Sequence, residues 1–252
     1  MRQLLPPDFT PNGEVKFFLE KLKSGLLNDA RRISQHLDNS KFKTVGCEIE
    51  IGPGKDIPSP AYEYNGSTVT LRGKIDRVDR YDAPDGNSYL SAIDYKTGDA
   101  EFKMSNLTEG SKIQLAYYLK ALCADGSRYN GCIPAAFFYF PLNVKQSAAD
   151  SEDEAENSSG KFTRLQGYAR DNEALAALGG SDFCKSAKAN GMDMESAFDT
   201  VDDLVMGMAQ KLSDGDFAAA PLNTRDCRYC DYYRLCYRQT NTESGEEGDD
   251  DE

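Results

Sequence analysis

Two short stretches decide the fold: V-T-L-R-G-K-I-D-R-V-D at residues 69–79 and Y-L-S-A-I-D-Y-K at residues 89–96. Both alternate polar positions with β-branched, aliphatic or aromatic ones, which predicts strands over 68–78 and 89–95. Residues 82–87 between them contain Ala-Pro-Asp-Gly, a sequence typical of a tight turn. The two stretches are therefore expected to pair as a β-hairpin.

The hairpin gathers three chemically suggestive residues. Alternation along the first strand places Asp76 on the face opposite its apolar side chains, and Asp94 and Lys96, two apart, point the same way on the second. Two carboxylates supply hard oxygen ligands for Mg²⁺, and a nearby lysine can orient a water molecule or stabilise developing charge. The set therefore fits metal-dependent hydrolysis of a phosphate ester, although a bare D-x-K triplet also fits a simple ion pair on a strand surface.

Apolar spacing predicts further elements on both sides of the hairpin. In chain order these are one or two helices over 15–37, a strand over 44–51, turns over 52–60, a helix over 111–123, a strand over 135–141, a strand over 161–168 and a helix over 199–214. Residues 144–160 are polar and low in complexity, which predicts a flexible loop. This order of elements predicts an α/β fold with a mixed central β-sheet flanked by helices.

The formal net charge of −13 over 252 residues seems unsuited to binding DNA, which depends on Lys and Arg. Much of the acid lies in two polar blocks, whose carboxylates are Asp150, Glu152, Asp153, Glu154 and Glu156, and Glu243, Glu246, Glu247, Asp249, Asp250, Asp251 and Glu252. Taking these twelve from −13 leaves about −1 on the rest of the chain, which permits a local basic groove. The second block predicts a disordered acidic tail over 241–252.

Several classes of protein are disfavoured. The sequence contains neither an apolar run of about 18 residues nor a signal peptide, which predicts a cytoplasmic protein without membrane association. A G-x-x-x-x-G-K-[ST] phosphate loop is also missing, so the chain itself is not expected to bind ATP.

Three motifs follow one another: G-K-I-D-R-V-D from Gly73, I-D-Y-K-T-G from Ile93 and Q-L-A-Y-Y from Gln114. In order and spacing they resemble the RecB-type branch of the PD-(D/E)XK nucleases, which implies a restriction-endonuclease-like core. The resemblance implies metal binding, by Mg²⁺ or Mn²⁺, at Asp76, Asp94 and the backbone carbonyl of Tyr95, with Lys96 as a catalytic residue. It also places Gln114 and Tyr118 on one face of a helix that contacts DNA or steadies the site.

Two further family features concern a glutamate and a histidine. Glu48 and Glu50 in G-C-E-I-E-I-G share a face, and either fits the family's glutamate on the preceding strand; the alignment favours Glu48, and the alternative is that both simply face solvent. The family's metal-binding His lies in an upstream G-x-x-x-H helix. His36, the one histidine, lacks that motif and is expected on an ordinary helix near the Glu48 strand. The isolated chain is therefore expected to be weakly active or inactive.

The seven cysteines include a tight C-x2-C-x5-C cluster formed by Cys227, Cys230 and Cys236. In an intracellular chain such clustering indicates a metal rather than disulfides, but zinc and a four-iron cluster each ordinarily take four ligands. The arrangement is similar to the C-terminus of AddB-type subunits, where three such cysteines and one far upstream hold a [4Fe-4S] cluster. Cys47 is a poor substitute for the upstream cysteine, so the cluster is expected to be incomplete in this chain.

Together these resemblances imply a RecB-like nuclease domain over residues 1–240, expected to be the C-terminal fragment of a longer AddB-type subunit. They imply a Mg²⁺-dependent DNA exonuclease that cuts one unwound strand while a helicase/nuclease complex with an AddA-type partner resects double-strand breaks for recombination. A stand-alone RecB-type nuclease of the CRISPR-associated kind is a sibling alternative. A catalytically silent DNA-binding or scaffold domain is the other, and the intact Asp76, Asp94 and Lys96 favour the enzymes.

Overall fold

The computed structural model describes residues 12–142, 164–187, 191–221, 227–228 and 230–236. Its helices are α1 (Gly13–Asn39), α2 (Met104–Thr108), α3 (Gln114–Cys123), α5 (Asn172–Ala177) and α6 (Met194–Asp214), with short 3-10 turns η2 (Gly180–Asp182) and η4 (Tyr233–Leu235). Its strands are β1 (Lys43–Ile51), β2 (Ala61–Tyr64), β3 (Ser67–Thr70), β4 (Gly73–Asp82), β5 (Ser88–Lys96), β6 (Ile133–Pro141), β7 (Leu165–Ala169) and β8 (Cys184–Ser186).

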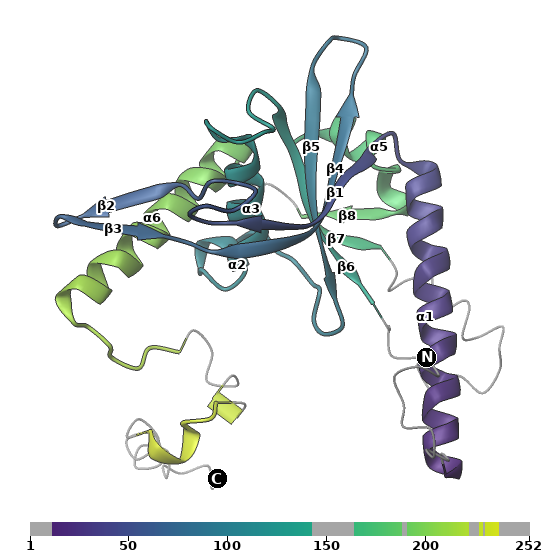
Figure 1. The fold of residues 1–252 in the computed structure, drawn as a ribbon, viewed down its shortest axis with the longest axis horizontal. Coiled ribbons are helices and arrows are strands. Elements are labelled where there is room, and N and C mark those ends of the chain that lie inside the picture. Colours follow the sequence, from purple (N-terminus) through teal and green to yellow (C-terminus); the bar gives the residue numbers. More distant parts are fainter. Residues whose placement is uncertain (1–11, 143–163, 188–190, 222–226, 229, 237–252) are drawn as a thin grey trace, which may run out of the picture.

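Within the described residues, six strands form one sheet in the order β1-β4-β5-β6-β7-β8, while β2 and β3 form a separate arm (Figure 1). The pairs β1–β4, β4–β5 and β6–β7 are antiparallel, and β5–β6 and β7–β8 are parallel. The sheet is therefore mixed, as expected. Parallel pairing of β5 with β6 requires a crossover, and this crossover carries α2 and α3.

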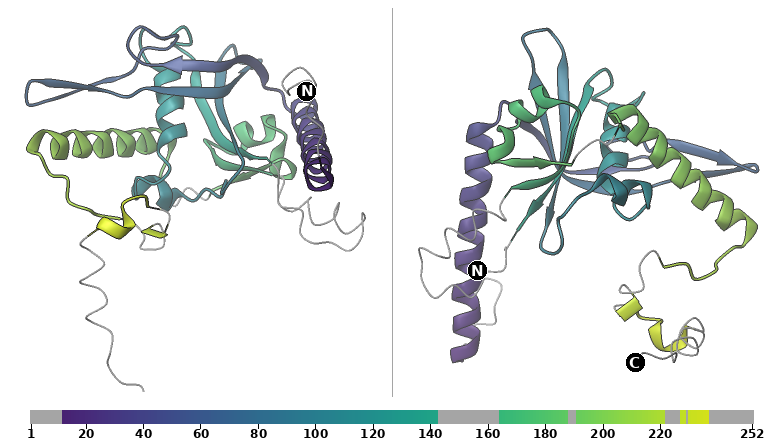
Figure 2. Two further views of the ribbon diagram at one scale, coloured as in Figure 1. Left: turned by 60° about the horizontal axis from the view of Figure 1, so that its bottom comes forward. Right: turned by 180° about the vertical axis from the view of Figure 1, so that it is seen from behind.

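Helices cover both faces of this sheet (Figures 1 and 2). Leu90 and Ala92 of β5 and Phe137 of β6 belong to the core shared with α3 and α6. Their sequence neighbours Ile93 and Phe138 belong to a second core that includes α5 and the end of α1. Alternating side chains thus fill two separate cores, so the central strands have no extended polar face.

The predicted hairpin is confirmed. The pairs Arg77↔Ile93 to Asp82↔Ser88 join β4 to β5, and the Ala83 and Gly86 amides make the turn bonds. The pairing stops at Arg77↔Ile93, although β4 continues to Gly73 beside β1 and β5 continues to Lys96 beside β6. The two strands therefore separate at this end of the hairpin, and we call the opening between residues 73–76 and 94–96 the fork.

The prediction of one continuous strand over 68–78 is wrong. The chain leaves β3 after Thr70 and enters β4 at Gly73, because the amide of Leu71 donates a hydrogen bond to Ser59 Oγ (3.1 Å) instead of continuing a ladder. Gly73 starts the new strand directly beneath the ring of Tyr118, where an added Cβ would overlap the ring. The apolar residues of β4 also do not alternate regularly, because Ile75 and Val78 are both fully buried and both belong to the core shared with α3 and α6.

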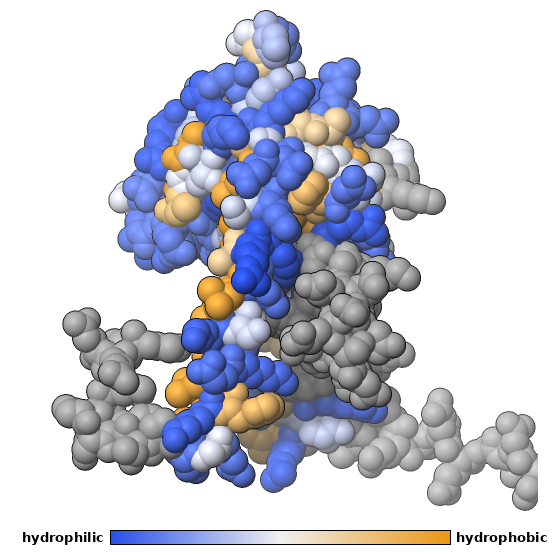
Figure 3. All heavy atoms as spheres, turned by 90° about the vertical axis from the view of Figure 1, so that its right-hand side faces the viewer, coloured by the Kyte–Doolittle hydropathy of each residue, from blue (hydrophilic) through white to orange (hydrophobic). Residues whose placement is uncertain are grey.

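Helix α1 is a single helix through Gly25, and the side chain of Asn12 caps it by accepting a hydrogen bond from the Val15 amide (2.9 Å). Only its last part packs on the sheet, where His36 is buried. Figure 3 shows apolar surface along the rest of this helix, and Phe17 there is 72% exposed.

The remaining predictions hold in part. The helix predicted over 199–214 is α6, which begins earlier because the side chain of Asp193 caps it at the Ser196 amide (2.8 Å). The strand predicted over 161–168 is β7. The loop at 144–160 and the tail at 241–252, with both acidic blocks, lie outside the described residues. No helix in the described ranges has the length and apolar character needed to span a bilayer.

Candidate active site

The fork brings Asp76 and Asp94 together at the end of a buried face. Where the β4–β5 ladder has stopped, Asp76 takes the place of a main-chain partner: its Oδ2 accepts a hydrogen bond from the Tyr95 amide (2.8 Å). Asp94 is close enough for the charge of Asp76 to act on it. The two carboxylates predicted from the sequence therefore share one site.

Asp94 is the buried member of the pair, with 5% of its surface exposed. Burial raises the pKa of its carboxyl, while the Lys96 ammonium opposes this shift and Asp76 adds to it. Asp94 Oδ2 lies 2.7 Å from Lys96 Nζ, yet among the described residues no donor is aligned to make a hydrogen bond with it. This desolvated oxygen therefore has a charged neighbour but, among the described residues, no aligned hydrogen-bond donor.

Lys96 lies at the mouth of the fork, with its side chain 35% exposed. Its ammonium is 5.5 Å from the centre of the Tyr139 ring, and the ammonium of Lys112 is 5.7 Å from the same centre. Lys112 is held there by the Glu101 carbonyl (2.5 Å) and the Asp99 carboxylate (3.0 Å). Neither Tyr139 nor Lys112 was predicted from the sequence, because the parallel pairing of β5 with β6 places Tyr139 beside Asp94 and contacts to residues 99 and 101 hold Lys112.

Gln114 and Tyr118, the predicted Q-x-x-x-Y pair, connect helix α3 to the start of β4. Gln114 Nε2 donates a hydrogen bond to Tyr118 Oη (2.8 Å), and the Lys74 amide donates to the same oxygen (3.2 Å). Tyr118 is buried over Gly73, so helix α3 is fixed to the strand two residues from Asp76. Gln114 itself is exposed and open to a ligand.

The structure separates the two candidate glutamates. Glu48, which has a left-handed backbone (φ 57°), forms an ion pair with Lys74, and this contact raises the pKa of Lys74. The charge of Asp76 also acts on Lys74. Glu50 instead forms its ion pair with Lys55 (2.8 Å), although it lies opposite Lys74 in the β1–β4 pairing and its charge also acts on that lysine. The arrangement favours Glu48 as the glutamate of this site.

His36 lies on the opposite face of the sheet. It is 1% exposed, and its Nδ1 lies 3.1 Å from the guanidinium of Arg77, whose side chain alternates with that of Asp76. Burial, helped by the charge of Arg77, lowers the pKa of His36 to about 4. His36 sits on an ordinary helix, as expected, and is remote from the carboxylates of the fork.

The clustered cysteines do not converge. Cys230 is exposed and Cys227 and Cys236 are partly buried, and all three are free thiols. Across the described ranges, no three His, Cys, Asp or Glu side chains gather as a metal-binding group. Cys47 is exposed on β1, far along the chain from these three.

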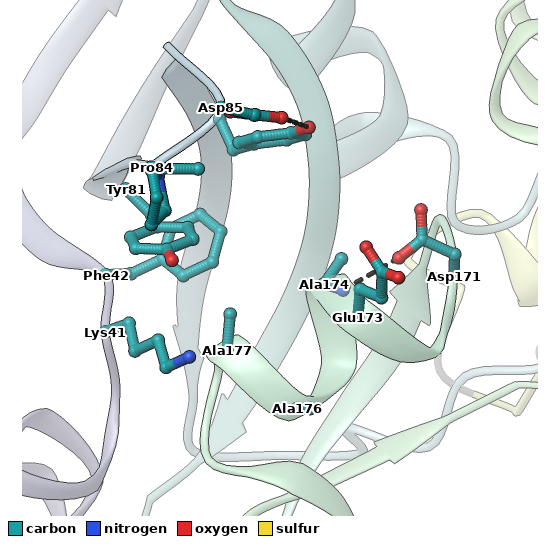
Figure 4. A pocket seen from close by; sticks show the side chains of 12 residues that line it. Lys41, Phe42, Tyr81, Pro84, Asp85, Asp171, Glu173, Ala174, Ala176 and Ala177 are labelled. Carbon is teal, nitrogen blue, oxygen red and sulfur yellow. Dashed lines mark hydrogen bonds between the residues drawn. The ribbon is translucent and has the colours of Figure 1, made fainter. Parts of the chain in front are cut away.

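A pocket of about 470 Å³ lies at the other end of the hairpin, between the 83–85 turn and α5 (Figure 4). Phe42, Tyr81 and Tyr89 form its aromatic wall, and Asp85 and Glu173 lie at its rim. None of the residues predicted to be catalytic lines this pocket.

Comparison with known proteins identifies the family of the chain. The chain matches the family model described as the PD-(D/E)XK nuclease superfamily over residues 2–237. It is 30% identical over 247 residues to a Carboxydothermus hydrogenoformans protein named as a subunit of an ATP-dependent helicase/deoxyribonuclease, covering 88% of this chain and 22% of that protein. The identically named protein of Desulforudis audaxviator is 29% identical over 249 residues, covering 88% and 21%.

The chain thus spans about a fifth of the length of the curated relatives it matches. Its mixed sheet flanked by helices is the restriction-endonuclease-like architecture implied by the motifs. With the D…D-x-K residues at the fork, the fold and the match over residues 2–237 lead to one conclusion: the chain belongs to the PD-(D/E)XK nuclease superfamily.

Proposed function

We propose that this chain is a metal-dependent DNA exonuclease domain that hydrolyses phosphodiester bonds of a single strand at the fork. The observation that carries the proposal is the convergence of Asp76, Asp94 and Lys96 where β4 and β5 separate. The superfamily match over 2–237 supports a single nuclease domain extending over residues 1–240.

The donor set at the fork fits a divalent cation. Nucleases of this superfamily generally use such metals, and the buried, under-bonded Oδ2 of Asp94 is an oxygen that a cation would satisfy. Asp76, Asp94 and the Tyr95 carbonyl would hold Mg²⁺ or Mn²⁺; Mg²⁺ is commonly held by one or two carboxylates, with water and substrate phosphate completing its shell. When bound, such a cation lowers the pKa of a water and offsets the charge that builds on the phosphodiester.

Side chains around the two carboxylates have the remaining roles in the proposed cleavage. Lys96, partly exposed beside Asp94, can orient the attacking water or stabilise charge on the phosphate. The charges of Glu48 and Asp76 both act on Lys74, whose ammonium can meet a neighbouring phosphate while the Glu48 carboxylate restrains it. Gln114 is exposed next to Tyr118 and can contact DNA, while Tyr118 keeps β4 in place.

The relatives suggest the setting in which the domain works. Both are named as parts of an ATP-dependent helicase/deoxyribonuclease, which favours a helicase-linked nuclease over a stand-alone one. We infer that the domain operates in the bacterial cytoplasm with an AddA-type helicase/nuclease partner. In that complex it would cut one unwound strand during resection of double-strand breaks.

The three clustered cysteines are best understood as part of a longer protein. We infer that Cys227, Cys230 and Cys236 contribute three ligands to a [4Fe-4S] cluster whose fourth ligand lies elsewhere in the longer protein. As placed here they do not form a ligand set, and no step of the proposed cleavage uses a cluster. Iron content and visible absorbance after anaerobic purification of the full-length protein test this assignment, and the absence of iron there would refute it.

The test of the nuclease is a cleavage assay on labelled single-stranded DNA with Mg²⁺ or Mn²⁺, using the chain and the full-length complex. Asp94→Asn and Lys96→Ala should each abolish cutting by this domain. Asp82→Asn on the exposed end of the same hairpin and Lys23→Ala on α1 are matched controls that should cut normally. Cutting that survives both substitutions at the fork, in a full-length complex whose partner nuclease has been inactivated, would refute the proposed mechanism.

A further inference from the structure

A buried polar network lies directly behind the fork, on the α1 face of the sheet. Arg77 is 3% exposed and donates hydrogen bonds to Tyr95 Oη (2.8 Å) and to His36 Nδ1 (3.1 Å). It also pairs with Asp79, which is fully buried (2.9 Å). Asp79 in turn accepts a hydrogen bond from the Thr44 hydroxyl of β1 (2.8 Å).

This network lies at the position where β4 and β5 separate. Arg77 is the last residue of β4 that pairs with β5, and Tyr95 lies on β5 beyond that last pair. The Arg77–Tyr95 hydrogen bond therefore links the two strands at the position where their main chains no longer do so. The Tyr95 amide also donates a hydrogen bond to the Asp76 carboxylate. Tyr95 is thus tied to β4 through both its side chain and its main chain.

Stability alone does not explain these charges. A buried ion pair is a weak source of stability, and apolar residues of similar volume often replace one without loss. An apolar side chain at residue 77, however, could not fix the hydroxyl of Tyr95. His36 then has a defined task, because its unprotonated Nδ1 accepts a hydrogen bond and orients the guanidinium that reaches Tyr95.

We propose that Arg77, His36 and the Tyr95 hydroxyl form a brace that sets the opening of the fork. They are positioning residues: they fix the main chain of Tyr95, and through it the separation of Asp76 and Asp94. The link from the brace to metal binding rests on the function proposed above, whereas the link from the brace to the main chain does not.

Amide hydrogen exchange tests the link to the main chain. Tyr95→Phe removes only the hydroxyl, and His36→Leu removes the acceptor, whereas His36→Asn keeps an acceptor near the position of Nδ1. In the first two variants the Tyr95 amide should exchange about tenfold faster relative to the amides of residues 136–138 in β6, as expected for loss of one buried hydrogen bond. The Asn variant should exchange like the wild type.

Two outcomes would overturn the brace. One is an unchanged Tyr95 amide in folded Tyr95→Phe. The other is equal acceleration of the Tyr95 and β6 amides, which would indicate general destabilisation instead of local positioning.

Calorimetric titration with Mn²⁺, in the absence of DNA, tests the link to the metal. Loss of a supporting contact behind a metal ligand typically weakens affinity about 10- to 100-fold, and Tyr95→Phe should show a loss of this size. Unchanged affinity in that variant would refute the link. If the wild type binds no Mn²⁺ while the exchange data show the local effect, the proposed function fails and the brace stands.

Discussion

Both faces of β4 carry charged residues, but the surroundings of these residues differ between the two faces. On the α3 face, Asp76 meets Asp94 and Lys96 at an opening where one carboxylate oxygen lacks a hydrogen bond. On the α1 face, Arg77 and Asp79 neutralise each other in a sealed core. The sequence D-R-V-D alone does not distinguish a carboxylate at the proposed site from a carboxylate in a buried ion pair. The position at which the β4–β5 pairing ends, and the helices that cover each face, make this distinction. Four changes would break or sharpen this contrast.

The largest effect is expected from Asp94→Asn on the open face. Removing this charge should lower cleavage by about 10²- to 10³-fold or more, the scale seen when a group that organises transition-state charge is lost. The thermal midpoint should stay constant or rise, because the carboxylate is desolvated and poorly satisfied, a common trade of stability for function. Single-turnover cleavage and thermal unfolding measure the two responses. A large loss of stability would show that Asp94 is structural.

On the sealed face, Arg77→Met should lower the free energy of unfolding by about 3–5 kcal/mol, because it leaves Asp79 buried without its partner. Arg77→Met/Asp79→Leu should recover most of that loss in chemical denaturation. If the brace exists, the double variant should still bind Mn²⁺ more weakly than the wild type. Failure of the double variant to recover stability would mean that the pair is required for folding.

The protonation of His36 should give the sealed face a pH dependence. The folded state keeps His36 neutral to about pH 4, against an ordinary pKa of 6.5, so the unfolded state binds more protons between these values. The free energy of unfolding should therefore fall as pH drops from 6.5 to 4, by up to about 3 kcal/mol. Denaturant unfolding of the wild type and of His36→Asn at several pH values measures this. The contribution is absent if both proteins show the same slope.

The smallest effect is expected where α3 covers the open face. Gly73→Ala would push its methyl group into the Tyr118 ring and should destabilise the fold by about 1–3 kcal/mol. Gly207→Ala in α6 is a matched control with open space, and it should stabilise by up to about 1 kcal/mol. Equal stabilisation of both variants in denaturant unfolding would show that Tyr118 is not tightly packed there.

The parts of the site that share a local pattern were predictable. The tight turn specified the hairpin, period two put Asp94 and Lys96 on one side, and the i,i+4 spacing joined Gln114 to Tyr118. These are short-range relations, which a sequence expresses directly. The mixed sheet followed from the order of elements.

The parts that depend on distant contacts were not predictable. The break before Gly73 depends on Tyr118 and Ser59, which come from other segments. Tyr139 reaches the site through the parallel pairing of β6 with β5, and the ammonium of Lys112 lies over its ring. Short elements such as β8 and α5 carry too few residues for a periodic signal.

The parallel pairing of β5 with β6 has a consequence for the history of the domain. Apart from Glu48 and the positioning residue His36, every residue proposed to act at the fork lies in the continuous stretch from Gly73 to Pro141, because the crossover returns α3 over the strands that precede it. This stretch can be inherited as one block. Lineages are then free to remodel β7, β8 and α5 at the sheet edge, and those segments should diverge fastest while the block is retained.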